Sequence, residues 1–183
     1  MSDTNWCVIS GAPSSGKTTL VNELERCGYR VIHEVARGII ETGMDEGQTL
    51  EEIRSDEESF ENLVLNTKIA IEAELPRDEV IFFDRAIPDS IAYFDIAGLD
   101  VDKAVAKSPR NRYKKVFLLD RLPYLKDHAR IEDQEDAVSL DQSLEASYSA
   151  LGYEVIRIGV VPVKDRLRRV IEEIEKEILW RGR

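Results

Sequence analysis

Short apolar segments and helical patterns alternate along this chain, and that alternation limits the folds open to it. Each apolar segment is rich in the residue types of buried strands and lies beside stretches whose apolar residues step by three or four. The five predicted strands are residues 5–10, 29–34, 80–85, 113–120 and 153–159. This alternation predicts an α/β fold, in which helices flank a parallel sheet and ligands bind at the carboxyl ends of its strands.

The helical patterns are amphipathic, as expected for helices that pack on a sheet. The longest predicted helix covers residues 49–75, and two others lie around 137–148 and 163–178. The 183 residues contain no internal repeat, low-complexity tract or linker rich in Pro and Gly. We therefore expect a single domain over residues 1–183.

The first predicted strand leads directly into GAPSSGKTT, residues 11–19, which fits the phosphate-loop pattern GxxxxGK[ST]. Gly11 and Gly16 allow the backbone to wrap a phosphate chain, and a helix that begins at Lys17 points its positive end at the same anion. We expect Lys17 to reach the β- and γ-phosphates and the Thr18 hydroxyl to bind Mg²⁺. The predicted nucleotide contacts are Gly11, Ala12, Pro13, Ser14, Ser15, Gly16, Lys17, Thr18 and Thr19.

The second predicted strand is followed by HEVARGII, which brings Glu34 to the same edge of the sheet. A carboxylate at this edge can take the proton of an attacking hydroxyl, so Glu34 is a candidate general base. The alternative is a glutamate that only favours the start of a helix. Arg37, one helical turn later, is a candidate for binding an anionic or polar acceptor, with a surface ion pair as the alternative.

The third predicted strand ends in a Walker B pattern, because four apolar residues precede Asp84. Asp84 is predicted to bind Mg²⁺ and to take part in catalysis. Asp120 also follows four apolar residues, but the usual strand order of P-loop kinases places the third strand beside the first, which favours Asp84. Arg85 is expected to bind a phosphate or carboxylate of the substrate. Asp89 is expected to contact substrate, with helix capping as the alternative.

The segment after the fourth predicted strand has no sustained period and mixes Arg121, Lys126 and Arg130 with Pro123. Mobile basic segments can close over transferring phosphates and exclude water, so residues 121–133 are predicted to form a lid. Arg130 is the catalytic candidate within it. The alternative is a solvated loop whose charges pair locally.

Composition limits the partners of the chain. The net charge of −11 opposes binding to a nucleic-acid backbone or an anionic membrane. No apolar run approaches a bilayer-spanning length of about 20 residues, and the first residues lack the pattern of a signal peptide. Cys7 and Cys27 do not have the spacing of a metal site. We expect a cytoplasmic protein that binds a nucleotide and a small-molecule acceptor, without nucleic acid or a membrane span.

Five motifs follow one another over about residues 5–172: GAPSSGKTT, HEVARGII, FFDRAIPDSIAYF, YKKVFLLDRLPYLKDHARIED and LGYEVIRI. In this order they resemble the P-loop ATPase family often described as an AAA-type ATPase domain. That family is related to the ribosylnicotinamide kinase domain and, more distantly, to deoxynucleoside kinases. The resemblance implies a five-stranded parallel sheet in the order 2-3-1-4-5, with ATP and Mg²⁺ as ligands. It also implies a general-base position for Glu34, an acidic-Arg pair at Asp84-Arg85 and a lid position for Arg130.

Three kinds of function are compatible with a phosphate loop. The carboxylate after the second strand and the basic segment after the fourth favour a small-molecule kinase, which transfers the γ-phosphate of ATP to a hydroxyl of a nucleoside-like or other metabolite. The alternative is a nucleotide-dependent switch with slow hydrolysis. The chain lacks the NKxD motif that gives regulatory GTPases their guanine specificity. If the protein is such a switch, the acidic residues 45–61 would be its partner surface. A mechanical ATPase ranks last, because no LSGGQ-type signature is present. The motifs specify neither the acceptor nor the oligomeric state.

Overall fold

Five strands form one parallel sheet in the computed structural model, which describes residues 3–110, 112–122 and 132–181. The strands are β1 (Cys7–Ser10), β2 (Arg30–Ile32), β3 (Ile81–Asp84), β4 (Lys115–Leu119) and β5 (Val155–Ile158). Their spatial order is β2-β3-β1-β4-β5, which confirms the predicted order. In the register of the sheet, Val8 of β1 lies between Phe83 of β3 and Val116 of β4.

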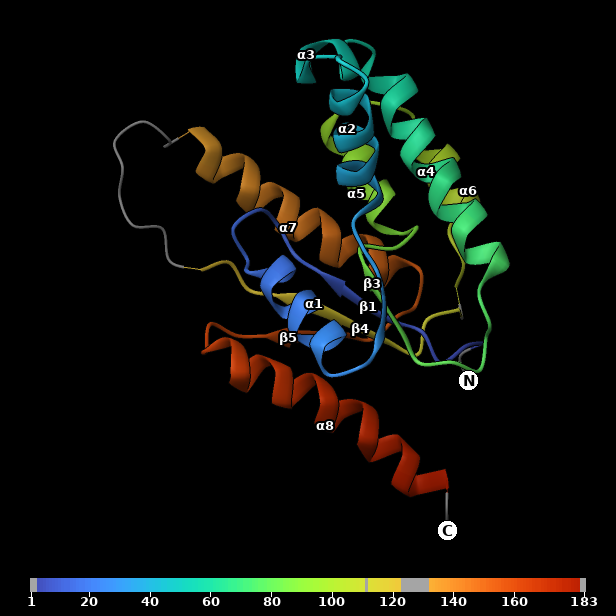
Figure 1. The fold of residues 1–183 in the computed structure, drawn as a ribbon, viewed down its shortest axis with the longest axis vertical. Helices are drawn as coiled ribbons and strands as arrows, with labels where there is room; N and C mark the ends of the chain where they lie inside the picture. The colour runs from blue at the N-terminus through green and yellow to red at the C-terminus, as the bar shows by residue number, and fades with distance from the viewer. Residues whose placement is uncertain (1–2, 111, 123–131, 182–183) are drawn as a thin grey trace.

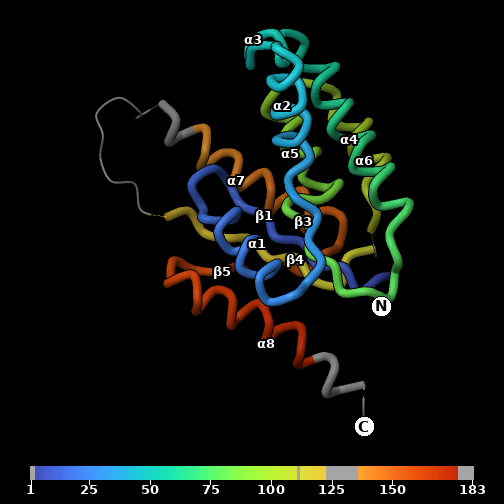
Figure 2. The backbone as a smooth tube through the Cα atoms, viewed as in Figure 1, coloured from blue at the N-terminus to red at the C-terminus, as the bar shows by residue number. Residues whose placement is uncertain are grey.

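Helices cover both faces of the sheet and extend beyond one end of it (Figure 1). Those of the described residues are α1 (Lys17–Arg26), α2 (Val35–Asp45), α3 (Leu50–Ile53), α4 (Glu57–Glu74), α5 (Asp89–Ile96), α6 (Val101–Lys107), α7 (Glu132–Ala150) and α8 (Val163–Arg181). Figure 2 shows α2, α3 and α4 grouped on one side of the molecule, with α8 on the opposite side.

The core lies on the two faces of the sheet, because successive residues of a strand point to opposite faces. On one face, Cys7 and Ile9 of β1 pack in a cluster with α1 and α8. On the other face, Val8 packs in a cluster that includes Tyr148 of α7. The apolar strands are buried on both sides, as parallel strands usually are.

The prediction of one long helix over residues 49–75 is wrong, because the structure contains two helices, α3 and α4. Thr49 begins α3 through a capping box with Glu52. Asp56 then caps α4, and its carboxylate accepts hydrogen bonds from the backbone N–H and the hydroxyl of Ser59 at 3.0 and 2.7 Å. Apolar spacing did not reveal the break, because apolar residues continue on both sides of it.

Most of the predicted lid, residues 121–133, lies outside the described residues. The start of this segment is described, and there the backbone N–H of Leu122 donates to the carbonyl oxygen of Ser14 at 3.1 Å. The segment therefore begins in contact with the phosphate loop. Within residues 3–110, 112–122 and 132–181, none of the helices has both the length and the apolar character needed to cross a membrane.

Candidate active site

The phosphate loop makes a tight turn between β1 and α1. Gly11 has a φ of +154°, and a Cβ at this position would lie 2.7 Å from Ser15 Oγ and 3.0 Å from the Leu119 carbonyl oxygen. Gly16, the N-cap of α1, is left-handed with a φ of +80°. No side chain caps α1, and its first turn contains no acidic residue. The turn therefore leaves the helix N-terminus available to an anion such as a nucleotide phosphate.

Lys17, the first residue of α1, contacts two acidic residues, Asp84 at the end of β3 and Glu34 after β2. Its Nζ donates to Asp84 Oδ1 at 2.5 Å and lies 3.6 Å from Glu34 Oε2. Lys17 and Asp84 are buried, whereas 21% of the Glu34 side chain is exposed. The structure thus brings together three of the four predicted catalytic residues. The fourth, Arg130, lies outside the described residues.

Arg85 completes this cluster from the position after β3. Its Nε donates to Glu34 Oε1 at 3.0 Å, and its guanidinium lies over the ring of Tyr93, 5.1 Å from the centroid. Its backbone is left-handed with a φ of +68°, which is unfavourable for a residue with a Cβ. Backbone strain of this kind is concentrated at active sites and ligand clamps. The predicted substrate residue Arg85 therefore has both the position and the strained backbone of a functional residue.

Glu34 does not use its side chain for the helix that follows it. It is the N-cap of α2, but its carboxylate makes no capping hydrogen bond. Burial alone raises the pKa of Glu34, yet Arg85 and Lys17 together outweigh burial and lower the pKa below its ordinary value. The carboxylate is therefore ionised at neutral pH and is not engaged in capping, so it is available to accept a proton. Glu34 also lies at the start of α2, where its charge favours the helix, so both interpretations agree with its position.

Asp84 lies in a different environment from Glu34. Burial raises the pKa of Asp84, and the charge of Lys17 opposes this shift. Asp84 and the hydroxyl of Thr18 supply oxygen ligands of the kind that Mg²⁺ takes beside nucleotide phosphates. Among the described residues, no group of three or more His, Cys, Asp and Glu side chains could hold a metal ion by itself. Their donor atoms are of the type that would hold Mg²⁺ together with phosphate oxygens and water, as predicted for these two residues.

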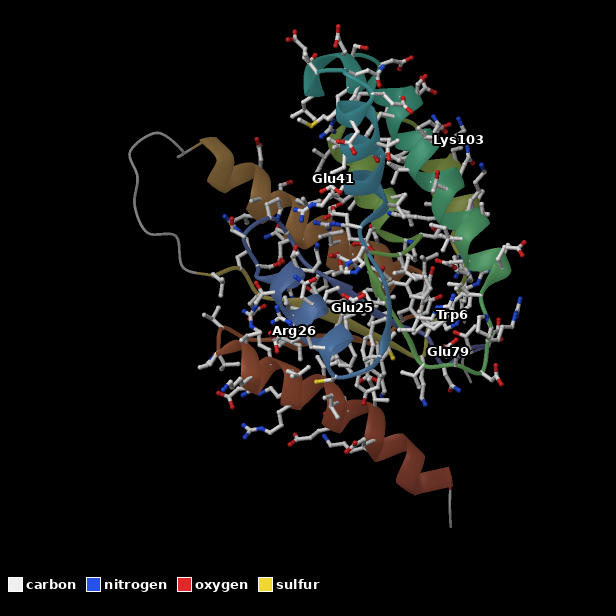
Figure 3. All side chains as sticks on the ribbon, in the orientation of Figure 1. Trp6, Glu25, Arg26, Glu41, Glu79 and Lys103 are labelled. Carbon is white, nitrogen blue, oxygen red and sulfur yellow. The ribbon has the colours of Figure 1, made fainter. Side chains whose placement is uncertain are left out.

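Three members of the cluster, Lys17, Glu34 and Arg85, line a cleft of about 770 Å³. Residues 12–19 of the phosphate loop form one side of the cleft, which we call the donor half. The other side, which we call the acceptor half, is formed mainly by α2, α4 and α5, and its lining includes Arg37, Glu41, Arg54, Phe60, Lys68 and Tyr93. Figure 3 labels Glu41 on α2. Glu34 and Arg85 line the same cleft, so the carboxylate lies where the two halves can meet.

The expected contact between Asp89 and substrate is not supported, because Asp89 is fully buried. Its carboxylate accepts hydrogen bonds from Ser10 Oγ at 2.5 Å, from the Ala86 backbone N–H at 2.9 Å and from the Tyr148 hydroxyl. These contacts fix the turn between β3 and α5. They leave no exposed oxygen for a ligand, and they differ from the helix-capping alternative, because no side chain caps α5.

Strand order alone does not separate the two Walker B candidates, because β1 pairs with β4 as well as with β3. Their contacts separate them. Asp84 accepts a hydrogen bond from Lys17 of the phosphate loop, whereas Asp120 Oδ1 accepts one from Arg157 at 3.2 Å. The preference for Asp84 therefore rests on its contact with the phosphate loop.

Lys68 lines the acceptor half but was not among the predicted site residues. Lys68 lies on α4 four residues after Val64 and eight after Phe60, and all three side chains are buried. A lysine that continues the register of an apolar helix face was the available signal. Such a residue is either paired inside the protein or turned toward a ligand.

Arg166 on α8 was also not among the predicted site residues, because its role depends on contacts with backbone carbonyls. Its buried guanidinium donates to the carbonyl oxygens of Gly159 and Asp120, both at 3.0 Å, and to that of Ser15. One side chain therefore joins the three loops that follow β1, β4 and β5. The phosphate loop is held in place from the side opposite the acceptor half.

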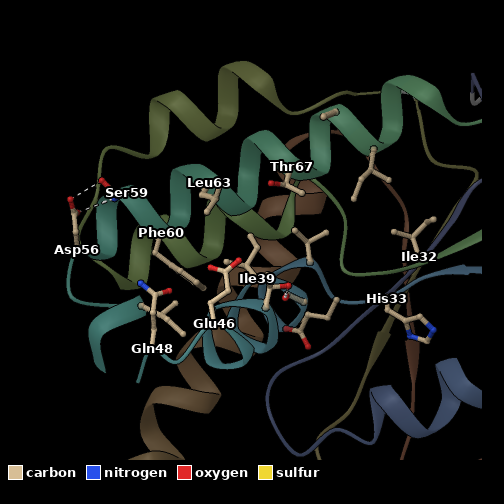
Figure 4. Close-up of a pocket in the computed structure, with 18 of the residues that line it drawn as sticks. Ile32, His33, Ile39, Glu46, Gln48, Asp56, Ser59, Phe60, Leu63 and Thr67 are labelled. Carbon is tan, nitrogen blue, oxygen red and sulfur yellow. Dashed lines mark hydrogen bonds between the residues drawn. The ribbon is translucent and has the colours of Figure 1, made fainter. Parts of the chain in front are cut away.

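A larger hollow of about 1260 Å³ lies on the other flank of α2, beside the edge strand β2. Figure 4 shows Ile39 of α2 and the α4 residues Phe60 and Leu63 around it. The polar residues Asp56 and Ser59 of its lining bind each other at the start of α4. Lys17 and Arg85 line the smaller cleft and not this hollow, so we assign the chemistry to the smaller cleft.

Comparison with solved structures finds the same fold in small kinases. A thymidylate kinase from Ehrlichia chaffeensis is 14% identical, with a TM-score of 0.66 over 96% of this chain and 100% of that one. A deoxyadenosine kinase from M. mycoides is 17% identical, with a TM-score of 0.64 over 93% and 98%. The NadR protein in complex with NR is 18% identical, with a TM-score of 0.65 over 95% of this chain and 51% of that one.

The sheet order, the phosphate loop and Asp84 at the end of β3 define a P-loop NTPase fold, the fold that the kinases above share. The model of the family described as AAA domain matches residues 6–166, and the chain belongs to that family. A search of curated proteins found no match.

Proposed function

We propose that this protein is a small-molecule kinase that transfers the γ-phosphate of ATP to a hydroxyl of a nucleoside-like or other metabolite. The observation that carries this proposal is the Glu34 carboxylate, which lies between Lys17 and Arg85 in a cleft with a donor half and an acceptor half. A protein that only holds a nucleotide does not need an ionised base facing a second compartment.

In the proposed reaction, the acceptor hydroxyl oxygen forms a bond to the γ-phosphorus, and the bond to the β-phosphate oxygen breaks to release ADP. Glu34 takes the hydroxyl proton. Lys17 and Arg85 stabilise the negative charge on the transferring group, and the backbone N–H groups of the phosphate loop hold the phosphates of ATP in place. Mg²⁺ bound near Thr18 and Asp84 would neutralise phosphate charge. Arg130 stays a predicted catalytic residue of the lid.

Several findings support this proposal. The similar solved structures carry the names of kinases, and the chain covers most of the thymidylate and deoxyadenosine kinase structures. The negative net charge agrees with a small-molecule acceptor rather than a nucleic acid. A cytoplasmic location stays a prediction from the sequence.

The test is transfer to an acceptor by the wild-type protein and by Glu34→Gln. The proteins are incubated with ATP, Mg²⁺ and pooled metabolites, and mass spectrometry identifies ions that gain one phosphate. We expect E34Q to lower kcat for transfer by about 100-fold or more, because a general base contributes on this order. Binding of ATP, measured by calorimetry, should change much less.

Glu25→Gln is the matched control, since Glu25 is an exposed acid near the end of α1, outside the cleft (Figure 3). E25Q should transfer phosphate like the wild type. If no metabolite accelerates ATP loss and E34Q leaves that loss unchanged, the kinase proposal is wrong. A nucleotide-dependent switch with slow hydrolysis would then be the better interpretation.

A further inference from the structure

Lys68 is a buried cation whose only hydrogen bond in the described structure is to a neutral group. It lies on α4 with 5% of its surface exposed, and its Nζ donates to Ser90 Oγ at 3.1 Å. It forms no ion pair with any carboxylate in the described part of the chain. A buried ammonium without an anionic partner is costly, so its position in the cleft lining needs an explanation.

The other buried or half-buried cations that face Glu34 differ from Lys68 in this respect. Lys17 binds Asp84, and Arg85 binds Glu34. Among the buried cations that line the cleft, Lys68 is therefore the one that forms no ion pair with a carboxylate in the described part of the chain.

Arg85 provides a second, independent observation in the same place. Its Nη1 is buried and has no hydrogen-bond partner among the described residues. The nearest carboxylate, that of Asp89, is 3.6 Å away and is already bound by Ser10 and Tyr148. The unused donor thus belongs to a residue that lines the same cleft as Lys68.

The two cations also influence each other. Burial lowers the pKa of Lys68, Asp89 opposes this shift, and the charge of Arg85 adds to it. An anion bound beside both side chains would remove this repulsion and satisfy the unused donor.

We propose that Lys68 Nζ and Arg85 Nη1 form an anion subsite in the acceptor half, and that the phosphate acceptor therefore carries a phosphate or carboxylate group besides its reactive hydroxyl. This inference rests on the proposed kinase function. It adds that an uncharged metabolite is a poor acceptor and that Lys68 determines the preference. The hydroxyl and the anion of the acceptor lie on the two sides of Arg85, which contacts Glu34 through Nε and faces the subsite through Nη1.

The first test measures anion binding without any phosphate transfer. The protein is saturated with a non-hydrolysable ATP analogue and Mg²⁺, so that the phosphate loop is filled, and sulfate is titrated at constant ionic strength against chloride. We expect a saturable rise in Tm for the wild type and at least roughly tenfold weaker sulfate binding for Lys68→Met. Lys68→Arg, which keeps the charge, should retain sulfate binding.

Lys103→Met is the matched control, because Lys103 is an exposed lysine on α6 on the outer side of the molecule (Figure 3). It removes the same charge and should leave sulfate binding unchanged. Binding of the ATP analogue reports whether K68M is folded. Absence of a saturable sulfate effect in the wild type, or its survival in K68M, overturns the subsite.

The second test compares acceptors in matched pairs with and without the anion. Nucleosides are compared with their 5′-monophosphates, and hydroxy acids with their amides. We expect the anionic member to be preferred in kcat/KM by roughly tenfold or more, and K68M to reduce that preference toward one. The pair with the larger preference identifies phosphate or carboxylate as the recognised group.

The two proposals fail in different ways. Transfer that depends on Glu34 but prefers neutral acceptors would retain the kinase and reject the subsite. Sulfate binding that depends on Lys68, with no transfer to any acceptor, would retain the subsite and reject the kinase.

Discussion

Glu34 is the residue at which the charges of the site meet. Its two carboxylate oxygens face different cations, with Oε1 at 3.0 Å from Arg85 Nε and Oε2 at 3.6 Å from Lys17 Nζ. Each cation in turn has a further acidic neighbour, Asp84 for Lys17 and Asp89 for Arg85. The carboxylate is therefore fixed in orientation as well as in charge, which is what a base needs to receive a proton along one direction.

The same contacts make folding stability depend on pH at this residue. Because the pKa of Glu34 is lower in the folded protein than the value of about 4.3 in an unfolded chain, the stabilisation is present above that value. It is lost as the pH falls through the folded pKa. We expect the difference in unfolding free energy between wild type and E34Q, from urea titrations, to be largest near pH 7 and to shrink below about pH 4. A difference that stays constant from pH 7 to the acid limit would show that the ion pairs do not stabilise the fold.

At the scale of elements, the break between α3 and α4 shapes the wall of the acceptor half. The capping box of Thr49 and the Asp56 cap both use side chains from the acidic stretch 45–61. At least part of that stretch therefore builds helix ends, which weakens its interpretation as a partner surface. Arg54, located between the two helices, lies over the ring of Phe60, 5.0 Å from the centroid, and so ties the break to the cleft.

The Asp56 cap can be tested separately from the chemistry. Asp56→Ala removes the acceptor of both hydrogen bonds from Ser59, so we expect Tm to fall by roughly 2–4 °C. Asp56→Asn keeps a good N-cap residue and should have little effect. Equal values of Tm for D56A and D56N would mean that packing, and not the cap, sets the start of α4.

The sequence could predict the features that follow from local patterns, but not the residues whose role depends on distant contacts. The strands, their order and the phosphate loop follow from local patterns: apolar runs, their alternation with helices and a motif with fixed backbone needs. The break at Asp56 was predictable from cap residues, but apolar spacing obscured it. Lys68 and Arg166 were missed because their roles depend on contacts with Ser90 and with backbone carbonyls far away in the sequence.

At the scale of the whole molecule, Arg166 links parts of the chain that are distant in sequence. Its carbonyl partners belong to Ser15, Asp120 and Gly159, so the guanidinium connects the phosphate loop to the ends of β4 and β5. The acceptor half lies on the other side, beside β2 and β3. The cleft is thus formed between a clamped loop and a separate group of helices.

Removal of the clamp should affect both stability and nucleotide binding. Arg166→Ala leaves three carbonyl oxygens without their donor, and we expect a loss of about 2–4 kcal/mol in unfolding free energy and weaker binding of ATP. Arg169→Ala, an exposed change on the same helix, is the control and should be neutral. Urea unfolding and calorimetry measure the two effects. Unchanged ATP binding in folded R166A would mean that the clamp supports only the fold.

The phosphate loop and helix α2 differ in how closely their surroundings hold them. The phosphate loop follows β1, which is paired on both sides, and Arg166 fastens it from behind. Helix α2 has the cleft on one flank and the apolar hollow on the other, so it has room to shift. We therefore expect the donor half of the proposed kinase to be more rigid than its acceptor half. A family built on this plan can change its acceptor by substitutions along α2 and α4 while its handling of the nucleotide stays the same.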